Sequence, residues 1–317
     1  MNVRVFMTTG FWFMRCLSVV RGIGNAGILI LMLTGSILGS QAFGQAAVQG
    51  PHDSSYRDPA ELVRKAVQNE VKAANEENAH FLFRSIKTTP KGSTTRIYVE
   101  TKEATAGLVI GYNGKGLTPE QQRDEEARVE RFVSNPEELR KKREQERDNA
   151  EHTMRIVRAM PDAFLYEYAG EEPGSEAIGR AGVALIKLRF QPDPNYDPPS
   201  RVEEVLTGMQ GYMLVDPVHH RIASIDGTLF KDVGFGWGIL GHLDRGGRFL
   251  VQQCEVGDDF WEMSNMTLKF TGKILLFKNL AITSTEAFSG FKRVPTDLTF
   301  AQALEMLKKE NSVVAAK

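Results

Sequence analysis

The sequence predicts an α+β protein built on a large curved antiparallel sheet, a half β-barrel of about ten strands. Helices are expected on its concave side, together with an inserted charged helical hairpin. Residues 185–190 and 266–270 alternate apolar and polar side chains with period two, which is typical of a sheet with one buried and one solvated face. The short glycine-containing gaps at 226–227 and 271–273 suit hairpins, because a parallel pair needs a crossover of about a dozen residues.

Helices are predicted at both ends of the strand-forming region. Asp58, Pro59 and Glu61 form a helix-start pattern, and apolar residues then recur at helical spacing as far as Ala74. A second amphipathic helix is expected over 296–310. The expected strands are 80–88, 94–101, 105–112, 163–168, 185–190, 204–216, 219–230, 248–256, 260–270 and 274–283.

Residues 117–160 interrupt the strand pattern with a strongly charged segment of helical period. Asn135 and Pro136 divide it into two helices, because the residue before a proline resists helical backbone angles. Eleven of the fifteen residues over 137–151 are charged. We expect a helical hairpin that projects from the sheet and is anchored through its last turns. Deleting 119–158 should then spare folding.

Two interpretations of this hairpin are open. It is a solvated insertion, because mixed runs of charge usually form wet helix faces. Alternatively, it is a docking arm for a protein partner in the cell envelope. In that case the candidates for partner contact are Arg140, Lys141, Lys142 and Arg143.

Residues 1–44 have the order of a secretory signal peptide. They contain three arginines and no acidic residue, then an apolar run over 26–38 and small residues over 40–44. A membrane anchor is disfavoured because a spanning helix needs about 20 apolar residues. Met14 is an alternative start to Met1. The predicted organisation is signal peptide (1–44), linker (45–57), a single half-barrel domain (58–310) containing the hairpin, and tail (311–317), with a periplasmic or secreted mature protein.

Charge and cysteine content restrict the possible partners. Removing the three leader arginines from the 39 basic residues leaves 36 against 40 acidic residues, so no nucleic-acid partner is expected. Cys254 then remains as a single cysteine, which excludes an internal disulfide and a cysteine metal site. Its place on a predicted strand, in phase with Val256, favours a buried and unreactive thiol.

The motifs that usually mark catalysis, a metal or a cofactor are missing. Residues 236–241 match a glycine-rich dinucleotide pattern, but a turn into another strand follows instead of a helix, so no cofactor is predicted. His219, His220 and His242 are interpreted as surface residues at strand ends rather than metal ligands. The protein is therefore expected not to be an enzyme. A hydrolase with an unrecognised site is the remaining enzymatic alternative.

Methionine and aromatic residues are frequent in the second half of the chain. They are either ordinary core or the lining of an apolar cavity in the mouth of the curved sheet, where such side chains adapt to a lipid chain. The candidates for ligand contact are Met213, Phe235, Trp237, Phe260, Trp261 and Met263.

The layout of residues 58–310 resembles the LolA/LolB outer-membrane lipoprotein carriers and the RseB-type sensor domain. Gly-Tyr-Met-Leu-Val-Asp-Pro over 211–217, followed by Arg221 and Ile222, is similar to a strand–turn–strand segment common in that group. The resemblance implies a half-barrel whose apolar concave side is plugged by helices. It also implies a periplasmic binding protein that shields an acyl chain of a lipid or lipoprotein. The alternative is an envelope interaction or sensor protein.

Overall fold

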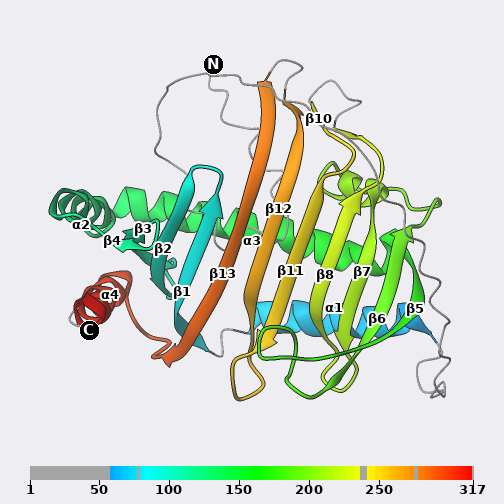
Figure 1. The fold of residues 1–317 in the computed structure, drawn as a ribbon, viewed down its shortest axis with the longest axis horizontal. Coiled ribbons are helices and arrows are strands. Elements are labelled where there is room, and N and C mark those ends of the chain that lie inside the picture. The colour runs from blue at the N-terminus through cyan, green and yellow to red at the C-terminus, as the bar shows by residue number, and fades with distance from the viewer. Residues whose placement is uncertain (1–57, 77–78, 236–240, 275–277, 316–317) are drawn as a thin grey trace, which may run out of the picture.

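The computed structural model describes residues 58–76, 79–235, 241–274 and 278–315. These residues form one open antiparallel sheet with helices packed against it (Figure 1), so the predicted fold class is confirmed. The strand order is β4-β3-β2-β1-β13-β12-β11-β8-β7-β6-β5, and β10 pairs with both β12 and β9. The predicted signal peptide and linker lie outside the described residues.

The helices are α1 (Pro59–Asn75), α2 (Pro119–Ser134), α3 (Pro136–Ala163), the 3-10 helix η1 (Glu203–Gly208) and α4 (Phe300–Ala315). The strands are β1 (His80–Thr89), β2 (Gly92–Val99), β3 (Ala106–Tyr112), β4 (Lys115–Gly116), β5 (Phe164–Pro173), β6 (Ala184–Pro192), β7 (Met209–Asp216), β8 (Arg221–Leu229), β9 (Val233–Phe235), β10 (Gly241–Leu243), β11 (Arg248–Glu255), β12 (Trp261–Ile274) and β13 (Lys278–Val294).

The first and the last strand of the sheet in chain order, β1 and β13, are neighbours. β1 pairs antiparallel with β13, which places Ser85 opposite Phe288 and Lys87 opposite Glu286. The meander β2–β3 continues the sheet beyond β1, and the other long strands continue it beyond β13. This one pairing therefore connects the N-terminal meander to the rest of the molecule.

One face of the sheet, which we call the inner face, packs against α1, α3 and η1. Figure 1 shows α1 and α3 behind the strands, with α3 crossing most of the sheet's width. The alternation of strand side chains directs apolar residues to this face, and Val63 of α1 and Val157 of α3 are completely buried against them. The largest core of the protein lies in this layer.

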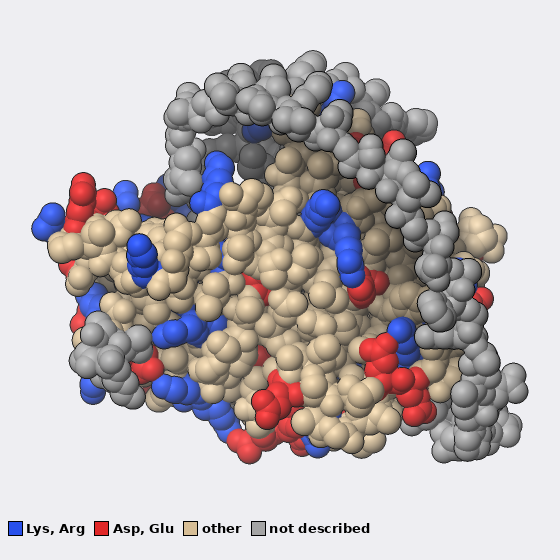
Figure 2. Space-filling model, viewed as in Figure 1, with Lys and Arg blue, Asp and Glu red and all other residues tan. Residues whose placement is uncertain are grey.

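The opposite, outer face is covered by α4 at the β1–β3 end. A second buried cluster forms there from Leu82, Ile97, Val99, Leu108, Phe300, Leu304 and Leu307. Because Phe83 and Tyr98 belong to the inner-face core, this end of the sheet is covered on both sides. Elsewhere on the outer face, Figure 2 shows positive and negative side chains interspersed among uncharged ones.

Helix α2 covers the outer edge of β3. The Val109 N–H donates to Glu125 Oε1 at 2.6 Å, and Arg128 Nη2 donates to the Gly107 carbonyl at 2.9 Å. Glu125 and Arg128 also form an ion pair at 2.6 Å. Unpaired backbone groups at a sheet edge otherwise invite association with other chains. The charged helix therefore completes the hydrogen bonding of this edge strand.

The predicted pair of helices is present, divided at Asn135 as expected, and the last turns of α3 are buried. The middle of α3 is also held, which the charge pattern did not indicate: Glu146 accepts from the Thr105 N–H at 2.9 Å, and Asn149 is buried. The structure therefore reverses the expectation for the 119–158 deletion. Removing these residues would strip Ile156 and Val157 from the main core.

Two glycines that predicted turns lie inside strands instead. Gly227 belongs to β8, and a Cβ there would lie 2.4 Å from the Phe249 ring. Gly272 belongs to β12, and a Cβ there would lie 2.1 Å from the His242 carbonyl oxygen of β10. Both glycines permit close approach of a neighbouring strand, which is the other common reason for glycine within a strand.

Replacing Glu125 by alanine should lower the free energy of unfolding by about 1–3 kcal/mol. The change leaves the buried Val109 N–H without its acceptor and the Arg128 guanidinium without its carboxylate partner. Urea denaturation followed by circular dichroism measures this loss. The matched control is Glu130→Ala on the exposed side of the same helix, which should change stability by no more than about 0.5 kcal/mol. Equal effects of the two changes would contradict the edge-cover interpretation.

Candidate ligand-binding face

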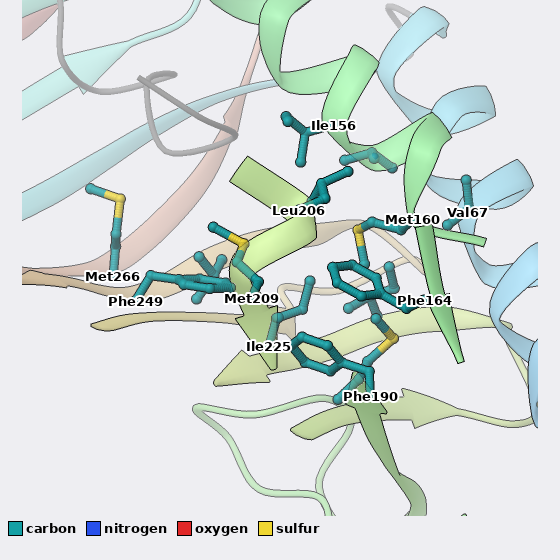
Figure 3. Close-up of a cluster of buried hydrophobic side chains, with 14 of the residues drawn as sticks. Val67, Ile156, Met160, Phe164, Phe190, Leu206, Met209, Ile225, Phe249 and Met266 are labelled. Atoms are coloured by element: carbon teal, nitrogen blue, oxygen red, sulfur yellow. The ribbon is translucent and has the colours of Figure 1, made fainter. Parts of the chain in front are cut away.

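The inner face is lined by methionines where α3 and η1 meet the strands. Figure 3 shows Met160 of α3, Met209 of β7 and Met266 of β12 among the aromatic and aliphatic side chains of this core, and Met213 belongs to the same cluster. All four are at most 4% exposed. Methionine is flexible and polarizable, so a core rich in it repacks more readily than one of branched residues.

An aromatic cluster continues the inner face toward the start of β1. Its rings are Phe81, Phe83, Tyr98, Phe260, Phe288 and Phe291. Neighbouring ring centroids lie 5.2 to 6.3 Å apart, within the range of stacked and edge-to-face pairs. Phe260 and Phe291 are only partly buried, so they form the accessible rim of the cluster. Sequence analysis singled out Phe260 but missed its partners, because they come from strands far apart in the chain.

A group of charged and polar residues interrupts this apolar face, and we call it the inner polar patch: Ser85, Lys87, Arg96 and Glu286. The Ser85 hydroxyl donates to Glu286 Oε1, and Lys87 Nζ lies 3.7 Å from Glu286 Oε2. Ser85 is completely buried and Glu286 is 1% exposed. Arg96 of β2 is the cross-strand neighbour of Ser85, on the same face.

Hydrogen bonding within the inner polar patch is incomplete. Among the described residues, neither Glu286 Oε2 nor the buried Arg96 Nε has a hydrogen-bond partner. The patch holds two cationic side chains and one carboxylate, so it is net positive. In addition, α3 crosses behind β1 and β13 (Figure 1) and carries the buried polar residues Asn149 and Thr153. A buried polar group without partners is costly, which makes this patch the most chemically distinctive part of the inner face.

The predicted ligand-contact residues do not share one surface. Met213 lies in the inner-face core, and Phe260 and Met263 are partly buried against it. Trp261 lies in a separate small cluster with Leu185. The side chain of Phe235 and the whole of Trp237 lie outside the described part of the chain. Ligand contact by any of these residues stays a prediction.

The predicted partner-contact residues lie in the first turns of α3. Arg140 pairs with Glu137 at 2.8 Å, and Lys141 lies 3.7 Å from the same carboxylate. Lys142 is partly buried beside Glu146, and Arg143 is exposed. These pairs join residues three or four positions apart on one helix, which stabilises the helix itself. A contact role stays a prediction.

The three histidines and the glycine-rich segment form no larger site in the described ranges. His219 Nδ1 lies 3.1 Å from Asp216 Oδ2, and His242 Nε2 lies 3.2 Å from Asp244 Oδ1. No group of three or more metal-ligating side chains occurs among the described residues. Residues 236–240 lie outside them. Of the described helices, none is both long and apolar enough to cross a membrane.

Removing only the carboxylate of the inner polar patch should lower the free energy of unfolding more than replacing the whole patch by apolar residues does. Glu286→Ala leaves the Lys87 ammonium, whose side chain is only 13% exposed, without its carboxylate, with an expected loss of about 3 kcal/mol in the free energy of unfolding. The quadruple change Ser85→Ala, Lys87→Met, Arg96→Met and Glu286→Met should stay within about 1 kcal/mol of the parent or exceed it. Urea denaturation compares the three proteins. A quadruple variant as unstable as Glu286→Ala would show that the patch is required for folding itself.

Cys254 should react slowly with alkylating reagents in the native protein. Burial, reinforced by the nearby carboxylate of Glu262, raises the pKa of its thiol. The reactive thiolate therefore forms only at a pH above the ordinary value of about 8.5. Iodoacetamide labelling followed by mass spectrometry should give little product at pH 8 and more as the pH rises. The urea-unfolded chain is the control, and equally fast labelling of both states at pH 8 would contradict this prediction.

Comparisons with known proteins give similarity at the level of solved structures. No protein-family model matches the chain, and no curated protein matches it. A DUF1329 family protein from Desulfovibrio piger is similar with 10% identity and a TM-score of 0.28, covering 79% of this chain and 99% of that one. A structure of MucB in complex with MucA(peri) is similar with 8% identity and a TM-score of 0.18, over 73% of this chain and 94% of that one. A chain of the Pseudomonas aeruginosa MucA/MucB complex has the same identity and TM-score, over 78% and 96%. These values do not assign the chain to a family.

Proposed function

We propose that this protein binds an amphipathic ligand whose acyl chain lies against the inner face and whose headgroup reaches the inner polar patch. The observation that carries the proposal is the patch itself. Two cationic side chains and one buried carboxylate lie within an otherwise apolar, methionine- and aromatic-lined face. If these positions only stabilised the core, apolar residues there would stabilise it equally well.

The charge of the patch favours an anionic headgroup. Glu286 neutralises one of the two cations, Lys87 and Arg96, so one positive charge is left in a partly buried environment. A carboxylate or phosphate can accept hydrogen bonds from both cations, and such charge-assisted bonds are about twice as strong as neutral ones. A ligand with an acidic headgroup and an apolar chain therefore satisfies both parts of the inner face.

The apolar part of the face offers a path for the chain. Phe260 and Phe291 are partly buried at the rim of the aromatic cluster, and the fully buried methionines lie farther along the same core. Flexible methionines can change rotamer to admit an acyl chain at lower cost than branched side chains can. With the predicted signal peptide over 1–44, the proposal describes a periplasmic protein that shields an acyl chain of a lipid or lipoprotein from water.

Binding of a fluorescent polyene fatty acid and of its methyl ester tests this proposal. Arg96→Met should weaken binding of the acid by about tenfold, because one charge-assisted contact is lost, while leaving the ester unchanged. The double change Phe260→Ala and Phe291→Ala should weaken both probes. Tyr212→Ala, which truncates an exposed aromatic ring on the outer face, is the matched control. Failure of the fatty acid to bind, or equal loss in the Tyr212 variant, would contradict the proposal.

A further inference from the structure

A cleft lies at the β1–β3 end of the sheet, where α2, β3 and α4 meet. Its volume is about 470 Å³. Its lining residues are Leu108, Val109, Leu117, Gln122, Glu125, Glu126, Lys308, Asn311 and Ser312. Ligand pockets commonly have volumes of about 300 to 1,000 Å³. The cleft is thus large enough to take one or two side chains of a partner.

The floor of the cleft is apolar and rigid. Leu108 and Val109 of β3 are nearly fully buried in the sheet, and Leu117 is partly exposed at the turn before α2. Helix α2 is held to the strand by Glu125, and it is held to α4 by an edge-to-face pair of Phe132 and Phe300 with centroids 6.0 Å apart. The walls are therefore fixed by contacts other than those with a ligand. Such a preformed cleft requires little ordering upon binding.

The rim of the cleft is net acidic. Glu125 is neutralised by Arg128, so the charged lining residues that remain are Glu126 and Lys308, and the surplus of negative charge comes from Glu305 outside the lining. Glu305 accepts a hydrogen bond from Lys308 Nζ at 2.5 Å, and this bond raises the pKa of the ammonium group. Glu130 and Glu126 raise the same pKa from a greater distance. The carboxylates near Lys308 therefore outnumber this lysine, and Glu305 is the one that bonds to it directly.

We infer that this cleft binds a short peptide segment that presents an apolar side chain next to a lysine or arginine. The apolar floor accepts the apolar side chain, and the surplus of carboxylates near the rim attracts the lysine or arginine. An acidic segment would meet like charges, which costs affinity. The α4 wall of the cleft belongs to the buried cluster on the outer face.

Fluorescence anisotropy with two labelled hexapeptides tests this inference. Both contain a central pair of leucines, flanked by lysines in one peptide and by glutamates in the other. The full mature chain should bind the basic peptide and not the acidic one. Glu126→Lys should weaken binding by about tenfold, since it replaces an attractive rim charge by a repulsive one. Leu117→Ser should also weaken binding through the loss of apolar contact.

The matched control is Glu138→Lys, which makes the same charge reversal at an exposed position of α3 that does not line the cleft. This variant should bind the basic peptide like the parent. Equal weakening in the Glu126 and Glu138 variants would show that only overall charge matters and would overturn the inference. Equal binding of the acidic peptide, or no binding of the basic one, would overturn it as well.

Discussion

The pairing of β1 with β13 is the interaction on which the rest of the structure depends. These strands are separated by nearly the whole described chain, and their ladder carries the meander β2–β3, with the helices α2 and α4 attached to it, beside the other strands. The buried ion pair of Lys87 and Glu286 bridges this junction. A slip of one residue in register would turn Glu286 to the outer face and Ala287 to the inner one. The same pair that marks the proposed headgroup site therefore also distinguishes the correct register.

An open sheet has two further requirements, a cover for its apolar face and a cover for its edges. Helices α1 and α3 cover the apolar face. At the edge formed by β3, Glu125 and Arg128 of α2 bind the otherwise unpaired backbone groups. The charged segment therefore has a structural function that its composition concealed. The same positioning of α2 beside α4 creates the acidic-rimmed cleft. One inserted helix thus both protects a strand edge and supplies a wall of a candidate site.

Local chemistry was sufficient to predict the fold class and most elements. Period-two alternation located β6 and β12, and Asp58 does cap α1 by accepting from the backbone N–H groups of Ala60 and Glu61. The pairing of β1 with β13 could not be predicted, because these strands are far apart in the sequence and meet only in the tertiary fold. Glu286 was not recognised as a candidate site residue either, because it lies in a strand with several small polar residues and becomes distinctive only beside Lys87. The glycines of β8 and β12 were ambiguous for the same reason: a turn and a close approach require the same residue.

Native mass spectrometry tests the central claim most directly, with protein exported to a bacterial periplasm and purified without detergent. The proposed function predicts a complex whose added mass corresponds to an acidic lipid or fatty acid, and the quadruple variant of the inner polar patch should carry less of it. The parent protein at its own mass alone, with no uptake of added fatty acid, would contradict the account. The methionines and aromatic rings of the inner face would then be core and nothing more.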